Sequence, residues 1–141
     1  MVTRKRLSTR FLPGVDPAAA IGELLGGTEG FAQDAALAQC DRERLAIVVE
    51  ELASNAARHG ADGATIELTL ELRAVGTGVD IRIEDDGAAF DPSRRGIFTG
   101  PHPETGGGVG LELVGAWCDM IAYAREGDRN RLDLRMARTR A

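Results

Sequence analysis

The chain has 141 residues and a net charge of −5, with 43% hydrophobic and 28% charged residues. This length favours one domain over residues 1–141 that can bury a core, and the composition is typical of a soluble globular protein. No apolar run approaches the roughly 18 residues that a membrane span needs, and no signal-peptide core follows the basic start, so we expect a cytoplasmic protein with no membrane partner. The negative charge and scarce aromatic residues also argue against direct binding of nucleic acid.

The N-terminal third predicts one strand followed by helical segments. Residues 4–12 alternate weakly and predict a polar edge strand that ends at Pro13. Asp16 and Pro17 predict the start of a helix, with Asp16 as its N-cap, and Gly26-Gly27 predicts its end. A second short helical segment is expected over residues 30–38.

The longest predicted helix runs from about Asp41, its expected N-cap, to His59, where Gly60 ends it. Its apolar residues recur at helical spacing and form one stripe: Leu45, Val48, Val49, Leu52 and Ala56. The cysteines Cys40 and Cys118 have neither metal-site spacing nor a disulfide pattern, so two buried thiols in a reducing compartment are expected.

Three later segments alternate strictly between apolar and charged residues, and each predicts a half-buried strand. They cover Thr65 to Leu72, Val79 to Asp85, and Arg131 to Met136. Strands with one apolar and one charged side are typical of a largely antiparallel sheet that helices cover on one face. The predicted fold is therefore a two-layer α/β (α+β) sandwich with a mixed, mostly antiparallel sheet and helices on one face.

Residues 87–108 are rich in Gly and Pro and predict a long loop, an unusual feature that indicates a functional segment. A helix is expected to begin near Val109. Its core-facing residues would be Leu113, Val114, Trp117 and Ile121.

Glu51 and Asn55 are four residues apart and lie together on one border of the apolar stripe of the longest helix, whereas Glu50 falls on the opposite flank. An amide oxygen is a suitable ligand for Mg²⁺. A neighbouring carboxylate can take a proton from an attacking hydroxyl. The alternative interpretation of this pair is a solvated polar helix face.

Asp85 continues the inward side of the strand that carries Val79, Ile81 and Ile83, whereas Asp86 does not. A carboxylate at the edge of a core needs a donor, and the exocyclic amine of adenine is one. Gly87 would leave room for the base to approach. The alternative interpretation is an ordinary Asp-Gly turn.

Gly106-Gly107-Gly108-Val109-Gly110-Leu111 directly precedes and opens the last predicted helix. Backbone amides without side chains can meet phosphate oxygens, and the N-terminus of a helix favours an anion. No Gly-Lys-Ser/Thr follows and no βαβ unit surrounds the segment, so neither a Walker loop nor a dinucleotide fingerprint is indicated.

These three motifs, in this order, resemble those of the GHKL (Bergerat-fold) ATPase superfamily: the N-box and the two glycine boxes. The resemblance covers roughly residues 40–137, and residues 91–105 take the position of the family's ATP lid. Within the superfamily, the chain is most similar to the anti-sigma-factor serine/threonine kinases of the RsbW and SpoIIAB type. Three features carry this resemblance: the acidic Glu51 followed by Asn55 and His59, the segment Phe90-Asp91-Pro92, and the short lid.

The resemblance implies a role for each matching residue. Glu51 would be the general base and Asn55 the Mg²⁺ ligand, with Arg58 as a phosphate contact. Asp85 would bind adenine beside Gly87. The remaining ATP contacts would come from Gly107, Gly108, Val109, Gly110 and Leu111. Relatives often carry an Arg just before the second glycine box, where this chain has Glu104-Thr105, so the γ-phosphate contact would come from Arg94 or Arg95 or would be missing.

The sequence therefore predicts an ATP-binding, Mg²⁺-dependent protein serine/threonine kinase that acts as an anti-sigma-type switch. The resemblance implies a STAS-type anti-anti-sigma protein as substrate and a sigma factor as a competing partner, and it leaves a homodimer open. The alternative is an ATP-binding interaction module without phosphotransfer. A histidine kinase is disfavoured because neither His59 nor His102 is placed as a phospho-acceptor.

Overall fold

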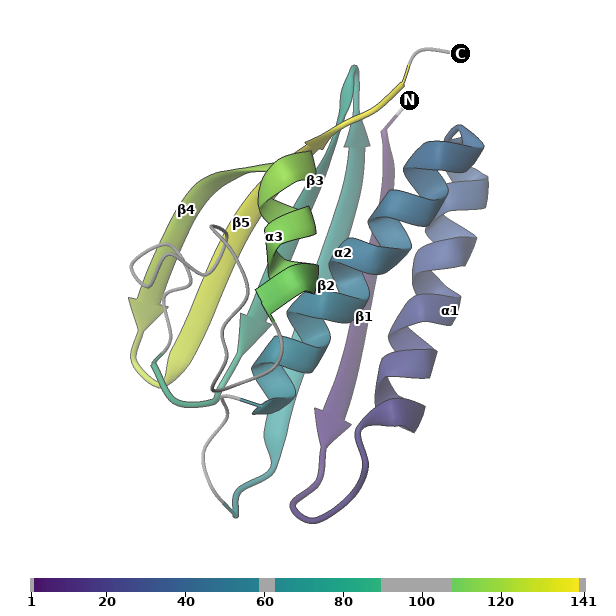
Figure 1. Ribbon diagram of the computed structural model, residues 1–141. Coiled ribbons are helices and arrows are strands. Elements are labelled where there is room, and N and C mark those ends of the chain that lie inside the picture. Colours follow the sequence, from purple (N-terminus) through teal and green to yellow (C-terminus); the bar gives the residue numbers. More distant parts are fainter. Residues whose placement is uncertain (1, 59–62, 90–107, 140–141) are drawn as a thin grey trace.

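The computed structural model describes residues 2–58, 63–89 and 108–139. They form five strands and three helices (Figure 1). In chain order these are β1 (Thr3–Phe11), α1 (Ala18–Asp34), α2 (Gln39–Arg58), β2 (Ile66–Val75), β3 (Gly78–Asp85), α3 (Gly108–Trp117), β4 (Cys118–Glu126) and β5 (Arg129–Ala137).

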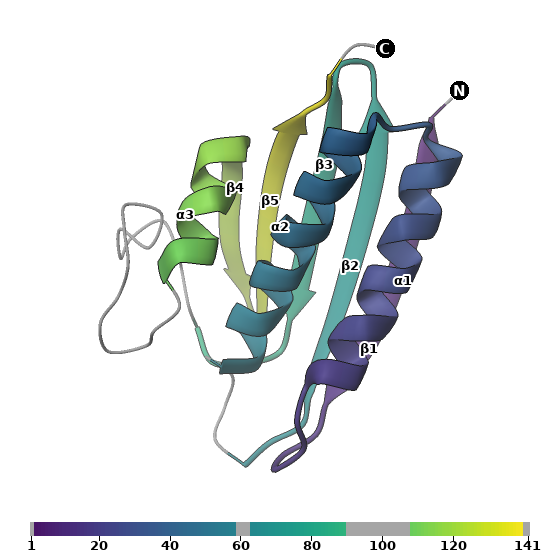
Figure 2. The same ribbon diagram turned by 45° about the vertical axis from the view of Figure 1, so that its right-hand side comes forward.

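The strands form one sheet in the order β1-β2-β3-β5-β4, and every neighbouring pair is antiparallel. The three helices lie together on one face of this sheet (Figures 1 and 2). The predicted two-layer α+β fold is therefore confirmed, and the described sheet is antiparallel throughout rather than mixed. The predicted polar edge strand is β1, which lies at one end of the sheet.

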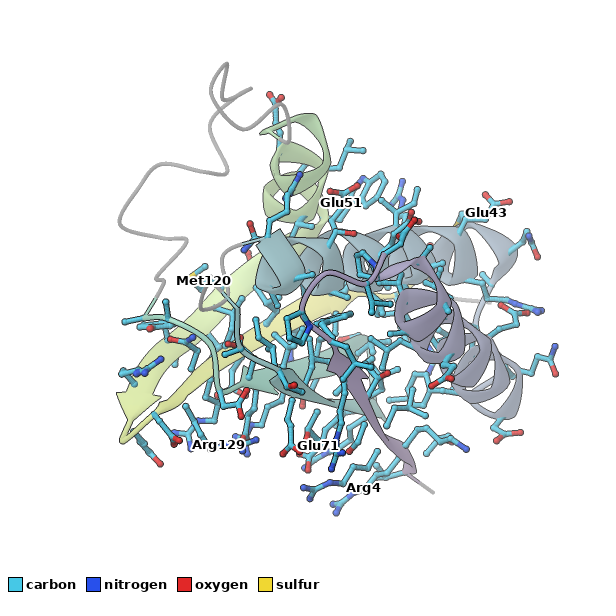
Figure 3. All side chains as sticks on the ribbon, turned by 90° about the horizontal axis from the view of Figure 1, so that it is seen from below. Arg4, Glu43, Glu51, Glu71, Met120 and Arg129 are labelled. Atoms are coloured by element: carbon cyan, nitrogen blue, oxygen red, sulfur yellow. The ribbon has the colours of Figure 1, made fainter. Side chains whose placement is uncertain are left out.

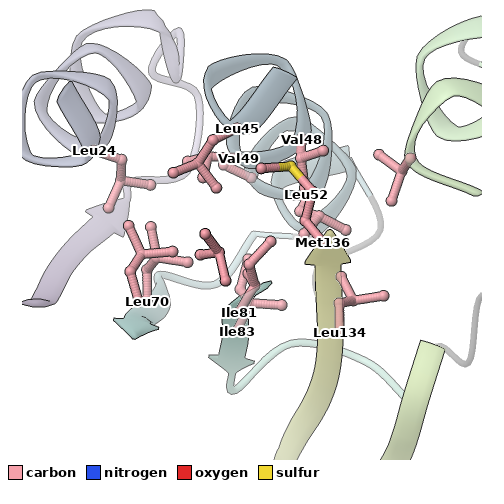
Figure 4. Packing of buried hydrophobic residues seen from close by; sticks show 14 of the residues in the cluster. Leu24, Leu45, Val48, Val49, Leu52, Leu70, Ile81, Ile83, Leu134 and Met136 are labelled. Carbon is pink, nitrogen blue, oxygen red and sulfur yellow. The ribbon is translucent and has the colours of Figure 1, made fainter. Parts of the chain in front are cut away.

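The core lies between the two layers (Figure 4). The alternation predicted from the sequence places one side of each central strand toward the helices, and the apolar residues on that side are buried. The central buried side chains include Leu45, Val48, Val49 and Leu52 of α2 against Leu70, Ile81, Ile83, Leu134 and Met136 of the sheet.

The prediction that Gly26-Gly27 ends the first helix is wrong, because α1 continues without a break to Asp34. Gly27 faces Leu7 of β1 so closely that a Cβ atom on Gly27 would lie 2.4 Å from a Leu7 methyl carbon. Packing of Leu24, Thr28 and Phe31 into the core outweighs the low helix propensity of glycine. The N-cap position is occupied by Pro17 and not, as predicted, by Asp16, although the Asp16 carboxylate accepts a hydrogen bond from the Ala18 backbone amide at 2.9 Å.

The prediction that Asp41 is an N-cap is also wrong. Asp41 lies inside the first turn of α2 and is fully buried. Its carboxylate accepts hydrogen bonds from the backbone amide of Thr139 at 2.6 Å and from its hydroxyl at 3.0 Å. The residue therefore attaches the segment after β5 to the helix layer. The predicted helix end at His59 and Gly60 lies outside the described residues.

The last predicted helix begins at Gly108, within one residue of the prediction, but it ends at Trp117. Ile121 was expected in its core stripe. It instead lies in β4 with 63% of its surface exposed, and Val114 is fully buried among the α3 residues whose burial the structure describes, 112–117. The two cysteines also differ from the prediction, because Cys118 is buried whereas Cys40 is exposed.

The face of the sheet opposite the helices is charged, and Figure 3 shows Arg4, Glu71 and Arg129 on that side and Glu51 on the helix side. Ion pairs connect neighbouring strands across it, including Arg82–Asp133 and Arg135–Asp80, each at 2.7 Å. Among the residues that the structure describes, no helix is long and apolar enough to cross a membrane.

Candidate functional site

Three of the predicted motif elements meet at one end of the sandwich. The C-terminal end of α2 lies at the same end of the sheet as the end of β3, where Asp85 pairs with Leu68 near the start of β2 (Figure 1). Helix α3 runs antiparallel to α2 in both views (Figures 1 and 2), and the Arg44 guanidinium lies 5.4 Å from the Trp117 ring centre. The start of α3 therefore lies beside the end of α2 that carries Asn55.

Asn55 has a polar atom with no partner. Its side chain is only 7% exposed, and its Oδ1 is buried without a hydrogen-bond donor from the described part of the chain. A buried amide oxygen without a partner typically costs about 1–3 kcal/mol. This geometry fits a site in which the oxygen contacts a ligand.

Glu51 lies one turn before Asn55 and is partly buried. Removal from solvent raises the pKa of its carboxyl group, and nearby Glu50 raises it further, whereas the positive charge of Arg58 lowers it. A carboxylate with a raised pKa is a better proton acceptor once ionised. Arg58 is exposed and is the last residue of α2. Its charge there also complements the helix dipole.

Asp85 lies on the inward side of β3, as the sequence predicts, and its carboxylate is partly buried. Oδ1 accepts hydrogen bonds from the Gly87 backbone amide at 2.9 Å and from the Asn130 side-chain amide at 3.0 Å. Asp86 has a different role, since its Oδ1 accepts a 2.7 Å hydrogen bond from the Glu67 backbone amide. Hydrogen bonds from the protein thus fix the orientation of the Asp85 carboxylate, whereas Asp86 extends the pairing of β2 with β3.

The β4–β5 hairpin supplies three side chains to this end of the site that sequence reasoning missed. Asn130, Tyr123 and Arg125 contact one another or the turn after β3. Arg125 donates to the Gly87 carbonyl at 2.7 Å. The strand alternation contains a signal for Asn130, because it shares the inward parity of Leu132, Leu134 and Met136. A polar residue on that side, directly opposite Asp85, would have indicated a site.

The second glycine motif is described only in part. Gly108, Val109, Gly110 and Leu111 form the first turn of α3, which provides the helix N-terminus that the sequence predicts. Gly107, Arg94, Arg95 and the predicted lid at residues 91–105 lie outside the described residues, as does His102.

The described residues also surround a hollow of about 680 Å³, but it lies on the charged open face of the sheet. Its lining includes Arg4, Arg73, Asp80 and Arg135 and none of the predicted site residues. All three acidic side chains of its lining, Glu71, Asp80 and Asp133, are in cross-strand ion pairs. We therefore place the candidate site at the end of the sandwich and not in this hollow.

Residues 15–136 match the family model of the histidine kinase-like ATPase domain. The chain belongs to this family. In keeping with that, it is similar to a solved structure of the Acinetobacter baumannii histidine kinase AdeS, with a TM-score of 0.52 and 21% sequence identity over 92% of this chain and 67% of that chain. This likeness concerns the fold. A comparison with curated proteins gave no match.

Because the chain belongs to this ATPase family, ATP is the ligand expected at the candidate site. Asn55 has a buried amide oxygen, Asp85 a carboxylate acceptor and α3 a helix N-terminus, which are groups of the kinds that can bind a nucleotide and its Mg²⁺. No cluster of three or more His, Cys, Asp or Glu side chains that could hold a metal by itself occurs in the described ranges. One protein oxygen suits Mg²⁺ that is bound mainly through phosphates and water.

Proposed function

We propose that this protein is an ATP-dependent protein serine/threonine kinase that acts as a regulatory switch. The observation that carries the proposal is the pair on α2: a buried Asn55 oxygen without a partner, one turn from a partly buried Glu51. In the proposal Asn55 contacts Mg²⁺ and Asp85 accepts a hydrogen bond from the adenine amine. Gly107 and the first turn of α3, from Gly108 to Leu111, receive the phosphates.

Glu51 is the residue that favours phosphotransfer over simple binding. Mg²⁺, when bound with ATP, would neutralise charge on the phosphates and orient the γ-phosphoryl group. Glu51 would accept the proton of an acceptor hydroxyl as that oxygen attacks phosphorus. The raised pKa of this carboxyl group matches it to the task. Arg58, whose charge acts on Glu51, would move toward the phosphates.

The acceptor in this proposal is a Ser or Thr hydroxyl of a second protein. A hydroxyl is the group from which Glu51 can take a proton. By resemblance we propose a STAS-type antagonist as the substrate and a sigma factor as a competing partner. ATP and ADP would then have to differ in their contacts with the protein, since only a differential interaction shifts a binding equilibrium.

Incubation of the purified protein with γ-labelled ATP, Mg²⁺ and the STAS protein encoded nearby tests the proposal. We expect label on a Ser or Thr of the STAS protein, located by phosphosite mapping. A tight, nucleotide-dependent complex without label would instead establish an ATP-binding module without phosphotransfer. The Glu104-Thr105 pair, where relatives often carry an Arg, is the feature that favours this second function.

A further inference from the structure

We infer that Asn130 is a positioning residue for base recognition, which it controls through Asp85. The inference rests on the proposed binding of ATP and extends it to the β4–β5 hairpin. It assigns to the Asn130 amide the task of holding the Asp85 carboxylate in the one orientation in which it can distinguish a purine with an exocyclic amine from one without.

The geometry begins with the register of the sheet. Asn130 lies directly opposite Asp85 on β3 and directly opposite Arg125 on β4, so three side chains form one row across three strands. Asn130 is 6% exposed. Its Nδ2 donates both to Asp85 Oδ1, at 3.0 Å, and to the Ala88 carbonyl, at 2.9 Å.

Asn130 and Gly87 together occupy one oxygen of the Asp85 carboxylate. Both donors contact Oδ1, at 3.0 and 2.9 Å respectively. Within the described residues no donor contacts Oδ2. The carboxylate is thereby fixed with one oxygen bound to the protein and the other available to an amine.

Tyr123 contacts the oxygen end of the Asn130 amide and supports its orientation. Its hydroxyl donates to Asn130 Oδ1 at 2.6 Å, so the oxygen of the amide points to the phenol and the nitrogen points to Asp85. The opposite orientation would place the amide oxygen against two acceptors, Asp85 Oδ1 and the Ala88 carbonyl, and the phenol would then have to accept from the amide instead of donating to it. Tyr123 is therefore the second member of the arrangement.

The hairpin also holds the backbone on which the base would rest. Arg125 donates to the Gly87 carbonyl at 2.7 Å, next to the Ala88 carbonyl that Asn130 contacts. The turn after β3 is thus fixed at two successive carbonyls. This leaves the Asp85 carboxylate little freedom to follow a ligand that does not match it.

A purely structural role for Asn130 makes a different prediction from a positioning role. Loss of a merely structural contact weakens the binding of every nucleotide by a similar factor. Loss of the positioning contact weakens only ligands whose base donates to Asp85. The ratio of the dissociation constants of two bases therefore separates the two roles.

The experiment measures, by calorimetry, the dissociation constants of ATP and of purine riboside triphosphate, which lacks the exocyclic amine. In the wild-type protein we expect ATP to bind roughly 10–100-fold more tightly, because the missing hydrogen bond is to a charged group. In Asn130→Ala this ratio should fall by about fivefold or more, with the affinity for the amine-free nucleotide nearly unchanged.

Two further variants keep the test decisive. Tyr123→Phe removes only the hydroxyl that orients the amide, and we expect it to lower the ratio in the same direction by a smaller factor, even where Asn130→Ala folds poorly. Arg129→Ala is the matched control, because Arg129 adjoins Asn130 in the chain but pairs with Glu84 at 3.5 Å. Its ratio should equal that of the wild type.

The outcomes separate this inference from the proposed function. Equal weakening of both nucleotides in Asn130→Ala, or an unchanged ratio in both hairpin variants, overturns the positioning role while leaving ATP binding intact. A wild-type protein that binds ATP and the amine-free nucleotide equally well removes the role of Asp85 as well. A wild-type protein that binds neither refutes the proposed function.

Discussion

The two ends of the candidate site differ in the hydrogen bonds that the protein itself makes to their polar atoms. At the end of β3, the Asp85 carboxylate already accepts two hydrogen bonds, from Gly87 and Asn130, before any ligand is considered. On α2, the Asn55 oxygen is buried with no donor from the described residues. At the proposed base-binding end one carboxylate oxygen is thus already held by the protein, whereas at the proposed phosphate-binding end the buried oxygen has no donor from the described residues.

This difference indicates which end should set selectivity for the base and which end should make the folded protein respond to the metal and phosphates. A preorganised acceptor loses little freedom on binding and so favours selectivity for one base. An unsatisfied buried oxygen gains most when a ligand reaches it, so the folded protein should respond to the metal and phosphates there. The predictions below test each half of this contrast, from the largest expected effect to the smallest.

Glu51→Gln should lower phosphotransfer by about 10²–10⁴-fold, since the amide cannot accept the proton of the acceptor hydroxyl. ATP affinity should change little. Labelled-ATP assays and calorimetry on the same preparation measure the two quantities. Glu50→Gln is the control, because Glu50 is exposed and lies on the other flank of the helix. Equal rates in wild type and Glu51→Gln would refute the role of the base.

Asp85→Asn should weaken ATP binding by about 1–3 kcal/mol. The substituted amide can keep its oxygen toward Gly87 and Asn130 only by turning its NH₂ group toward the amine of the base, so that two donors face each other. Calorimetry measures the loss. Asp86→Asn is the matched control, because an amide oxygen can still accept from Glu67. Unchanged affinity in Asp85→Asn would remove Asp85 from the site.

Asn55→Ala should remove most of the gain in ATP affinity that Mg²⁺ provides, by roughly tenfold, because one protein oxygen is lost from the metal. Titrations of ATP with Mg²⁺ and with a chelator give this gain. Ser54→Ala is the neighbouring control. A Mg²⁺ effect of the same size in Asn55→Ala would show that the unsatisfied oxygen has another purpose.

The smallest expected effect concerns stability. Burial raises the pKa of Glu51 above its ordinary value of 4.5, so the folded protein holds this proton more tightly than the unfolded chain does. The stability that this group contributes is therefore present at low pH and is lost as pH rises from 4.5 through the raised pKa. Denaturant unfolding should show Glu51→Gln gaining stability relative to the wild type as pH rises above 4.5. The opposite trend would contradict the desolvation of Glu51.

Much of the base-binding end was predictable because strand parity is a local property. The alternation of Val79, Ile81 and Ile83 placed Asp85 on the inward side, and the structure agrees. The same reasoning, extended one step along β5, would have found Asn130. Strand parity could not show that Asn130 contacts Asp85, because the two residues are 45 positions apart in the chain.

The departures from prediction have the same origin in contacts between distant residues. Gly26-Gly27 has the composition of a helix end, yet α1 stays continuous because Leu24, Thr28 and Phe31 on either side of it pack into the core. Asp41 has the residue type of an N-cap, yet its carboxylate is occupied by Thr139, 98 positions away. Helix propensity reflects only the local sequence. At Gly26-Gly27 and at Asp41, contacts with residues distant in the chain decide the structure instead.

Both chain ends leave the sandwich at the end opposite Asp85. β1 begins where Thr3 pairs with Ala74, and β5 ends where Ala137 pairs with Gly78, so both lie beside the β2–β3 turn (Figure 1). A polypeptide fused to either end would therefore extend away from the nucleotide. Because the start of β1 and the end of β5 lie close together, a domain of this architecture can be joined to other domains or inserted into a larger chain. In either case the candidate site at the opposite end would stay exposed.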